Sequence, residues 1–248
     1  ALFGHPEARN IWENHSFAQV RTLGWVDAPA FPSVFKHPPT QAMLTAYVDD
    51  FDLQASKEDS EKHWKEIEKK IDFKEPARYW SQEPTSHLGC QHRIAQTKTA
   101  DGHTVTTHTA EMKAYLLDLV SKFEVKYNVI VKECKTPYLD ATEEKKIVEG
   151  SRNDEKPRFG NEACSPLMSG LYAARSARPD LNVATLRNAR RITRWTIVDD
   201  AKLLRYIGYI KKTAGLGRQS KLSTADLETA VLRIWPDADL AGDPSEDT

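Results

Sequence analysis

The alternation of hydrophobic and polar residues along the chain predicts a mixture of helices and short strands. Apolar residues recur every three or four positions most clearly over 109–123, which predicts an amphipathic helix with one buried face. Ser56 and Asp59 resemble a capping box that opens another helix, and Pro179 suits the first turn of a helix that reaches about Trp195. Further helices are predicted over 6–24, over 166–177 and from about 203 to the glycines at 215 and 217.

Period-two runs bounded by turn residues predict two β-hairpins. In LTAYVDDFDLQAS, residues 44–56, two short strands flank the adjacent Asp49 and Asp50. A second hairpin is predicted where 86–96 and 101–108 meet through Asp101 and Gly102. The Pro-rich 30–39 should be extended, the charged and unpatterned 140–162 should form a solvated linker, and a strand should begin near 227. The mixture predicts an α+β fold.

The adjacent Asp49 and Asp50 are unusual because strands disfavour Asp. Two interpretations are open. Asp is a favoured turn residue, so the pair could simply form a solvent-exposed turn. Alternatively, two carboxylates at a tight turn could hold Mg²⁺ for phosphoryl transfer, because hard oxygen ligands suit that ion.

Charge is unevenly distributed along the chain, although the net charge over 248 residues is only −1. Nine Lys and Arg residues against two Asp give the segment 187–218 a local net charge of +7. Arg187, Arg190, Arg191 and Arg194 recur at helical spacing and should form one basic stripe on a helix. Such a stripe could contact phosphates or could be an ordinary solvated helix face. Residues 234–248 carry five acidic residues and no basic one.

Cysteine and histidine usage gives only weak evidence of a metal site. His87, Cys90 and His92 are the one dense cluster of soft ligands, but on a strand His87 faces away from the other two and no fourth ligand is near in sequence. Three widely spaced cysteines do not form a disulfide framework, so we expect a reducing intracellular setting, cytoplasmic or nuclear. No apolar run is long enough to span a membrane, so we expect no membrane partner.

The order of the motifs resembles the reverse transcriptase of copia-type retrotransposons. In that family a Gly-containing segment and a helix precede a YVDD hairpin. The hairpin is followed by a helix, an LG-containing strand and a helix with a TP motif. After these come an RPD helix pair, an LRY helix and a DAD motif. The resemblance spans nearly the whole chain and is strongest in the combination of YVDD, RPD and DADLAGD. The matching stretches here are ALFGHPEARNIWENHSFAQVRTLGW, LTAYVDDFDLQAS, EKHWKEIEKKIDF, SHLGCQHRI, MKAYLLDLVSKFEVKY, CKTPYLD, SGLYAARSARPDLNVATLRNARRITRW, LLRYIGYIKKTAGLG and WPDADLAGD.

The resemblance implies an RNA-directed DNA polymerase that uses two Mg²⁺ ions, an RNA template, a DNA primer and deoxynucleoside triphosphates. Asp49 would be the principal metal ligand of the hairpin, with Asp50 supporting it and Tyr47 near the primer terminus. Gly4 would help to form the floor under template and nucleotide, and Leu88 and Gly89 would grip the primer. Contacts to the nucleic-acid backbone would come from Arg187, Arg190, Arg191 and Arg194. The first metal-binding carboxylate of RNase H would be Asp237, or Asp239 if the alignment slips by two residues.

The sequence departs from the family in ways that bear on activity. The family's palm needs a further Asp on a strand upstream of the motif at Ala1, and its fingers and most of RNase H are also missing from this sequence. We therefore expect a piece of a longer polyprotein that does not polymerise by itself. Smaller departures are His5 for Leu, His87 for an aromatic residue and Leu240 for Trp, which also fit a degenerate copy.

The predicted organisation is a partial reverse transcriptase palm with its hairpin, a helical connection and the first strand of an RNase H-like domain. The expected parts are a palm and thumb-like portion at 1–139, a charged linker at 140–162, a helical connection at 163–218 and the start of RNase H at 225–248. The competing hypothesis is a non-catalytic remnant, or domesticated module, that binds nucleic acid through residues 187–218.

Overall fold

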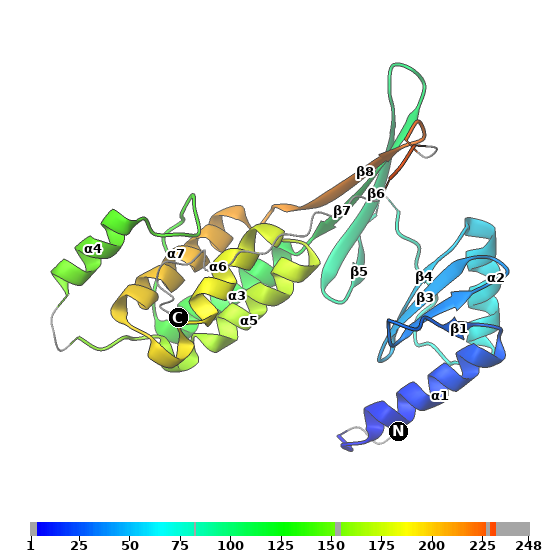
Figure 1. Ribbon diagram of the computed structural model, residues 1–248, viewed down its shortest axis with the longest axis horizontal. Coiled ribbons are helices and arrows are strands. Elements are labelled where there is room, and N and C mark those ends of the chain that lie inside the picture. Colours follow the sequence, from blue (N-terminus) through cyan, green and yellow to red (C-terminus); the bar gives the residue numbers. More distant parts are fainter. Residues whose placement is uncertain (1–3, 82, 152–154, 227–228, 232–248) are drawn as a thin grey trace. The chain divides into compact units, whose positions relative to one another are not determined.

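The computed structural model shows an α+β protein with two antiparallel sheets, as predicted (Figure 1). It describes residues 4–81, 83–151, 155–226 and 229–231. The chain divides into two compact units, one made of residues 1–80 with 85–90 and the other of residues 81–84 with 91–248. Residue 139, where we expected the palm-like portion to end, therefore lies inside the second unit.

The first unit is a four-stranded antiparallel sheet, sheet A, with two helices. The strands follow chain order, so each pairs with the next through a short connection. The predicted first helix, the YVDD hairpin and the helix after Ser56 are present, and the Ser56 hydroxyl accepts a hydrogen bond from the Asp59 amide at 3.2 Å. The region 30–39, predicted to be extended, is extended only over 34–37, because the residues before and after that strand form turns. The elements are α1 (Ala8–Thr22), β1 (Val26–Asp27), β2 (Val34–His37), β3 (Ala42–Tyr47), β4 (Asp50–Gln54) and α2 (Lys57–Glu68).

One face of sheet A and both helices enclose the core of the first unit. Along β3 burial alternates strictly, with Ala42, Leu44 and Ala46 buried and the residues between them exposed. The buried face packs on Val20 of α1 and Ile67 of α2, so both helices cover the same side of the sheet. Since a shift of one residue would turn these side chains to solvent, this alternation determines the register of the hairpin.

The second unit joins an antiparallel sheet, sheet B, to a group of helices. Sheet B has the order β5-β6-β7-β8. β5 lies within residues 85–90, which group with the first unit, whereas β7, β8 and all of β6 after Cys90 belong to the second. The predicted hairpin around Asp101 and Gly102 lies between the two central strands. In Figure 1, β6, β7 and β8 extend away from the helices. The strands are β5 (Thr85–His87), β6 (Cys90–Lys98), β7 (Thr104–Glu111) and β8 (Gly217–Ser223).

The helices of the second unit pack around α7, with α3, α4 and α6 all against it and α5 between α3 and α6 (Figure 1). Leu203, Ile207 and Ile210 of α7 are fully buried. The α-helices are α3 (Lys113–Tyr127), α4 (Ala141–Gly150), α5 (Cys164–Ser176), α6 (Asn182–Ala189) and α7 (Ile197–Thr213), with the 3-10 turns η1 (Gly160–Glu162), η2 (Pro179–Leu181) and η3 (Ile192–Arg194).

The RPD sequence forms an ion pair between a buried arginine and a more exposed aspartate near the end of α7. Arg178 is 1% exposed and makes two hydrogen bonds to Asp180, at 2.8 and 2.7 Å. It also donates at 2.9 Å to the Thr213 carbonyl at the C-terminus of α7, which accepts a second hydrogen bond from the Leu216 amide. Burial alone would raise the pKa of Asp180, but hydrogen bonds from Arg178 and Tyr209 outweigh it and the pKa is lowered.

The observed elements differ from the predicted ones at three places. The helix predicted over 109–123 begins at Lys113, because Thr104–Glu111 is rich in β-branched residues and pairs with both neighbouring strands. The predicted linker contains α4, which Asp140 and Glu143 open with a capping box. β8 was not predicted, because GRQSKLS lacks apolar alternation.

The helix predicted from Pro179 to Trp195 is also wrong, since it breaks into η2, α6 and η3. The break places Arg191 beside the buried carboxylate of Asp199, at 3.3 Å. It also lets the Trp195 indole donate to Asp200 at 2.7 Å. A continuous helix would not turn the chain toward the N-terminus of α7 in this way. The predicted strand near 227 falls largely outside the described residues.

Gly208, in the interior of α7, should not tolerate a side chain. A Cβ there would collide with the Lys132 carbonyl and lie 3.0 Å from the Cys134 sulfur. Alanine is the better helix former, so only this contact can make Gly208→Ala destabilising. We expect a loss of about 3 kcal/mol in the free energy of unfolding, measured by urea denaturation with circular dichroism. Gly215→Ala is the control because a Cβ there meets nothing within 4 Å; equal effects would contradict the argument.

Arg178→Met should destabilise the second unit, because it removes the two hydrogen bonds to Asp180 and the two that the buried guanidinium makes to Thr213 at the end of α7. We expect the free energy of unfolding to fall by about 3 kcal/mol in the same denaturation experiment. Arg175→Met, three residues earlier on the exposed face of α5, should change stability by less than about 0.5 kcal/mol. A loss below about 1 kcal/mol for Arg178→Met would show that solvent replaces the lost contacts.

Candidate functional site

The YVDD sequence forms a two-residue turn at the end of sheet A. Tyr47 pairs with Asp50 across the hairpin, so Val48 and Asp49 are the turn residues. Asp49 and Asp50 are both exposed, and the Tyr47 side chain is 56% exposed. The structure thus brings three of the predicted site residues together, with both carboxylates open to solvent.

Val48 adopts a strained backbone conformation. Its φ is 57°, in the left-handed region that Gly and Asn occupy with least cost. Val is β-branched, so this conformation costs on the order of 1–3 kcal/mol. An exposed turn without further constraint would favour Gly at this position.

The outer face of sheet A carries a third carboxylate near the turn. Asp52 pairs with Thr45 and therefore lies on the same face as Asp50 and Tyr47. Sequence reasoning did not select Asp52; the period-two spacing from Asp50 was the available signal. Among the described residues, however, no group of three or more Asp, Glu, His or Cys side chains is arranged to hold a metal ion.

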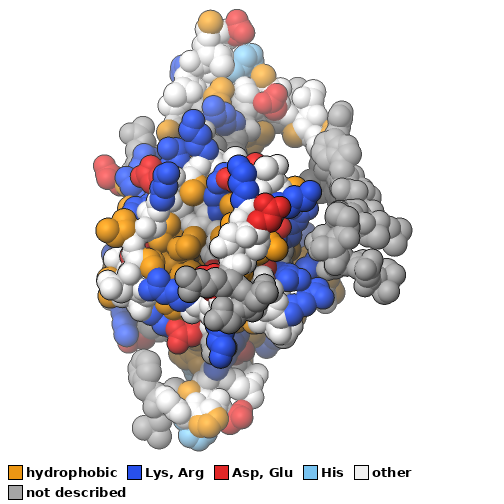
Figure 2. Space-filling view, turned by 90° about the vertical axis from the view of Figure 1, so that its left-hand side faces the viewer, with side chains coloured by type: hydrophobic (Ala, Val, Ile, Leu, Met, Phe, Trp, Pro, Cys, Tyr) orange, Lys and Arg blue, Asp and Glu red, His pale blue; other side chains and the backbone are white. Residues whose placement is uncertain are grey.

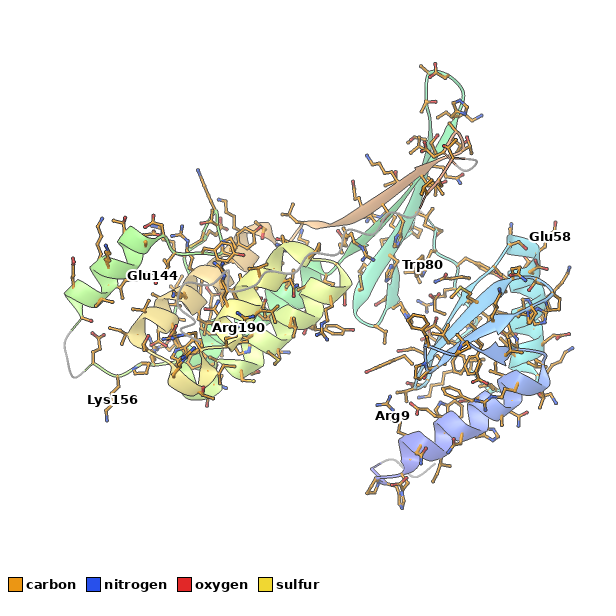
Figure 3. All side chains as sticks on the ribbon, in the orientation of Figure 1. Arg9, Glu58, Trp80, Glu144, Lys156 and Arg190 are labelled. Carbon is orange, nitrogen blue, oxygen red and sulfur yellow. The ribbon has the colours of Figure 1, made fainter. Side chains whose placement is uncertain are left out.

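Helix α1 is bonded directly to the turn. The indole N–H of Trp12 donates to the Val48 carbonyl at 2.7 Å. Trp12 packs against the core of the first unit, and α1 itself is anchored there by Val20, which is fully buried, and by Phe17, whose ring lies 5.0 Å edge-on from that of Phe35. Arg9, labelled in Figure 3, lies on the same helix and pairs with Glu13 at 2.8 Å.

Other predicted nucleic-acid residues belong to other turns of the chain. Leu88 and Gly89, with φ of 50° and 73°, form the turn between β5 and β6 of sheet B. Gly4, with φ of 88°, lies in a turn before α1. Asp237 and its alternative Asp239 are outside the described residues.

The residues of the predicted basic stripe do not lie on one continuous helix. Arg187 lies on α6 with its guanidinium 5.6 Å from the centre of the Tyr138 ring, and Arg190 follows the helix (Figure 3). Arg191 precedes η3, and Arg194 is its last residue. Of the nine Lys and Arg residues between 187 and 218, at least five form ion pairs. These pairs are Arg191–Asp199, Lys202–Glu144, Arg205–Glu143, Lys211–Glu124 and Lys212–Glu133.

Four of those five acidic partners come from outside the basic segment, on α3, α4 and the chain between them. The local charge of +7 is therefore largely offset where the helices pack. Figure 2 accordingly shows Lys and Arg side chains interspersed with acidic and hydrophobic ones rather than gathered in one continuous patch.

The soft-ligand cluster is divided between two strands of sheet B. His87 ends β5, and Cys90, which begins β6, is buried. His92 instead contacts His108 of β7, with Nδ1 and Nε2 3.0 Å apart. Burial and then Arg218 lower the pKa of His108. The part of the chain that is described holds no three-residue metal cluster here either.

A second histidine pair lies between sheet A and α2. The Thr40 hydroxyl bridges His37 Nδ1, at 2.9 Å, and His63 Nε2, at 3.0 Å. The two imidazole rings are 4.5 Å apart and both contact the buried Trp25. Burial lowers the pKa of His63, and His37 lowers it further. The other charged groups near His63 are Asp59, Glu66 and Lys62.

Comparisons with protein-family models, with curated proteins and with solved structures find no match to this chain. In the described part of the chain, no helix is both long enough and apolar enough to cross a membrane.

The buried His63 should make the stability of the first unit depend on pH. A lowered folded-state pKa means that the unfolded chain binds a proton more readily, so stability is full above the unfolded pKa near 6.5 and is lost as the pH falls toward the folded value. Thermal melting followed by tryptophan fluorescence should show a lower melting temperature at about pH 5.5 than at about pH 7.5.

His63→Gln should flatten this pH dependence, because Gln can still bond to Thr40 but does not titrate. His103→Gln, in the exposed turn between β6 and β7, is the matched control and should leave the pH dependence intact. An unchanged slope in His63→Gln would assign the pH dependence to other groups.

Proposed function

We propose that this chain is part of an RNA-directed DNA polymerase of the copia retrotransposon type, in which Asp49 and Asp50 bind Mg²⁺. In nucleotidyl transfer, paired Mg²⁺ ions activate the primer hydroxyl and stabilise the leaving pyrophosphate. Carboxylate oxygens suit that ion, and a tight turn presents them without a covering side chain. The expected partners are an RNA template, a DNA primer and deoxynucleoside triphosphates.

The observation that carries the proposal is the geometry of the YVDD turn. Asp49 and Asp50 are exposed, Val48 is held at a φ of 57°, and Tyr47 lies exposed beside them. Backbone strain of this kind is concentrated at functional sites, because ordinary turns replace the strained residue with Gly. The strain favours the metal-binding interpretation over a plain solvent-exposed turn.

A complete metal site needs at least one more ligand. β4 is an edge strand of sheet A, so its outer backbone groups could pair with a further strand. A carboxylate on such a strand would lie near Asp50 and Asp52, where the described residues form no three-ligand group. We therefore expect weak metal binding and no polymerisation by this chain alone.

The competing hypothesis, a non-catalytic nucleic-acid-binding module, draws less support. It depends on the basic segment 187–218, in which five side chains are already paired with acidic residues. Arg187 and Arg194 remain exposed and could still contact phosphates.

Binding of Mn²⁺, used in place of Mg²⁺, tests the proposal directly. Paramagnetic broadening of amide signals in the full chain should be strongest at residues 48–50, and Asp49→Asn should weaken the metal affinity at least about tenfold. Asp101→Asn removes a carboxylate from another exposed turn and is the matched control. Broadening that is absent from the YVDD turn, or that persists in Asp49→Asn, would contradict the proposal.

Primer extension on an RNA template with Mg²⁺ separates activity from metal binding. We expect no extension by this chain. Extension that disappears in Asp49→Asn would overturn that expectation while supporting the polymerase proposal. Nucleic-acid binding that depends on Arg187 and Arg194 and is indifferent to Asp49 and to Mn²⁺ would favour the binding module instead.

A further inference from the structure

Val48 is the turn residue of the YVDD hairpin with a positive φ, and its strained conformation needs an external support. Among the described residues, the positive-φ positions other than Gly are Ser33, Gln41, Val48, Leu88 and Asn128, and Val48 alone of these is β-branched. A two-residue turn has few contacts of its own, so the hairpin itself offers little to hold this conformation.

Trp12 provides such a support from another element. Its indole donates to the Val48 carbonyl at 2.7 Å, across 36 residues of sequence. That carbonyl belongs to the peptide group between Val48 and Asp49. A hydrogen bond to this carbonyl therefore limits rotation of the peptide plane that precedes the Asp49 Cα, and so limits where the Asp49 side chain can point.

The support is rigid because Trp12 is itself held. It packs on the core of the first unit, and its own carbonyl accepts a hydrogen bond from the Ser16 hydroxyl at 2.9 Å. Ser16 is fully buried, and Val20 one turn further along α1 is fully buried as well. The indole N–H thus points from a fixed helix to a strained turn.

We propose that Trp12 is a positioning residue, whose indole N–H holds Val48 in the left-handed conformation and so directs the Asp49 carboxylate toward the bound metal. The metal-dependent part of this inference rests on the proposed function of the turn. The backbone-dependent part does not, because it concerns the conformation of residues 48 and 49 in the absence of any metal.

Trp12→Phe is the decisive variant, since it keeps an aromatic ring and removes only the donor. In NMR spectra of the full chain without metal, the strong intraresidue amide-to-Hα Overhauser effect that marks a positive φ should weaken at Val48, and the Asp49 amide signal should shift. In the Mn²⁺ titration, affinity at the turn should fall about fivefold, the loss expected for one hydrogen bond.

Trp64→Phe controls for loss of an indole from the same core. Trp64 packs against that core and lies edge-on to Phe73 with ring centres 5.9 Å apart. It should leave the Val48 signals and the Mn²⁺ affinity unchanged. If both Phe variants disturb residues 48 and 49 equally, the effect is general loosening of the core and the positioning role is wrong.

Val48→Gly tests whether the indole acts through the strained residue. Gly adopts a positive φ without penalty, so removal of the indole should matter less in that background. We expect Trp12→Phe to weaken Mn²⁺ binding by less than about twofold when position 48 is Gly, against about fivefold when it is Val. An equal loss in both backgrounds would overturn the inference.

The outcomes separate this inference from the proposed function. If the wild-type chain binds no Mn²⁺ at the turn, the metal-binding proposal fails, and the Val48 and Asp49 signals in Trp12→Phe still decide the role of the indole. If Mn²⁺ binds but Trp12→Phe changes neither those signals nor the affinity, the metal site stands and the positioning role fails.

Discussion

The alternation of buried and exposed residues along β3 is the constraint on which the first unit depends. Ala42, Leu44 and Ala46 must face α1 and α2, and this requirement leaves one register for the hairpin. The same register places the two Asp residues where the strand turns. The position of the carboxylates thus follows from the packing of the opposite face of the sheet, and the hydrophobic core and the candidate site share one cause.

Electrostatic pairing plays the corresponding part in the second unit. The helices there carry charges that look excessive along the sequence, but α3 and α4 supply acidic partners for α7. Exposed pairs of this kind contribute little individually. The pair of Arg178 with Asp180 is different, because the guanidinium is buried and also bonds to the end of a helix. The charged side chains of the second unit thus serve mainly to join its elements. Less positive charge is left unpaired to attract a polyanion.

Local patterns were sufficient to predict the elements whose stability is local. The YVDD hairpin, the helix that Ser56 opens and the hairpin around Asp101 all carry their own turn or cap signals. The pattern was not sufficient where tertiary pairing decides. Residues 109–111 continue a helical spacing but belong to β7, and the Arg-rich segment bends where its side chains bond to the carboxylates at 199 and 200. At the site, the Asp pair was predictable, whereas the bond from Trp12 spans a distance that no local pattern reveals.

Sheet B is joined to the helices through two of its strands at once. Only Met112 separates β7 from α3, and only the three residues Ala214, Gly215 and Leu216 separate α7 from β8. Since β7 pairs with β8 and α3 packs on α7, each of the four elements is connected to two of the others. No long flexible connection therefore lies between these two strands and the helices. A force on β7 or β8 is transmitted through the backbone to α3 and α7, so these two strands and two helices should move together.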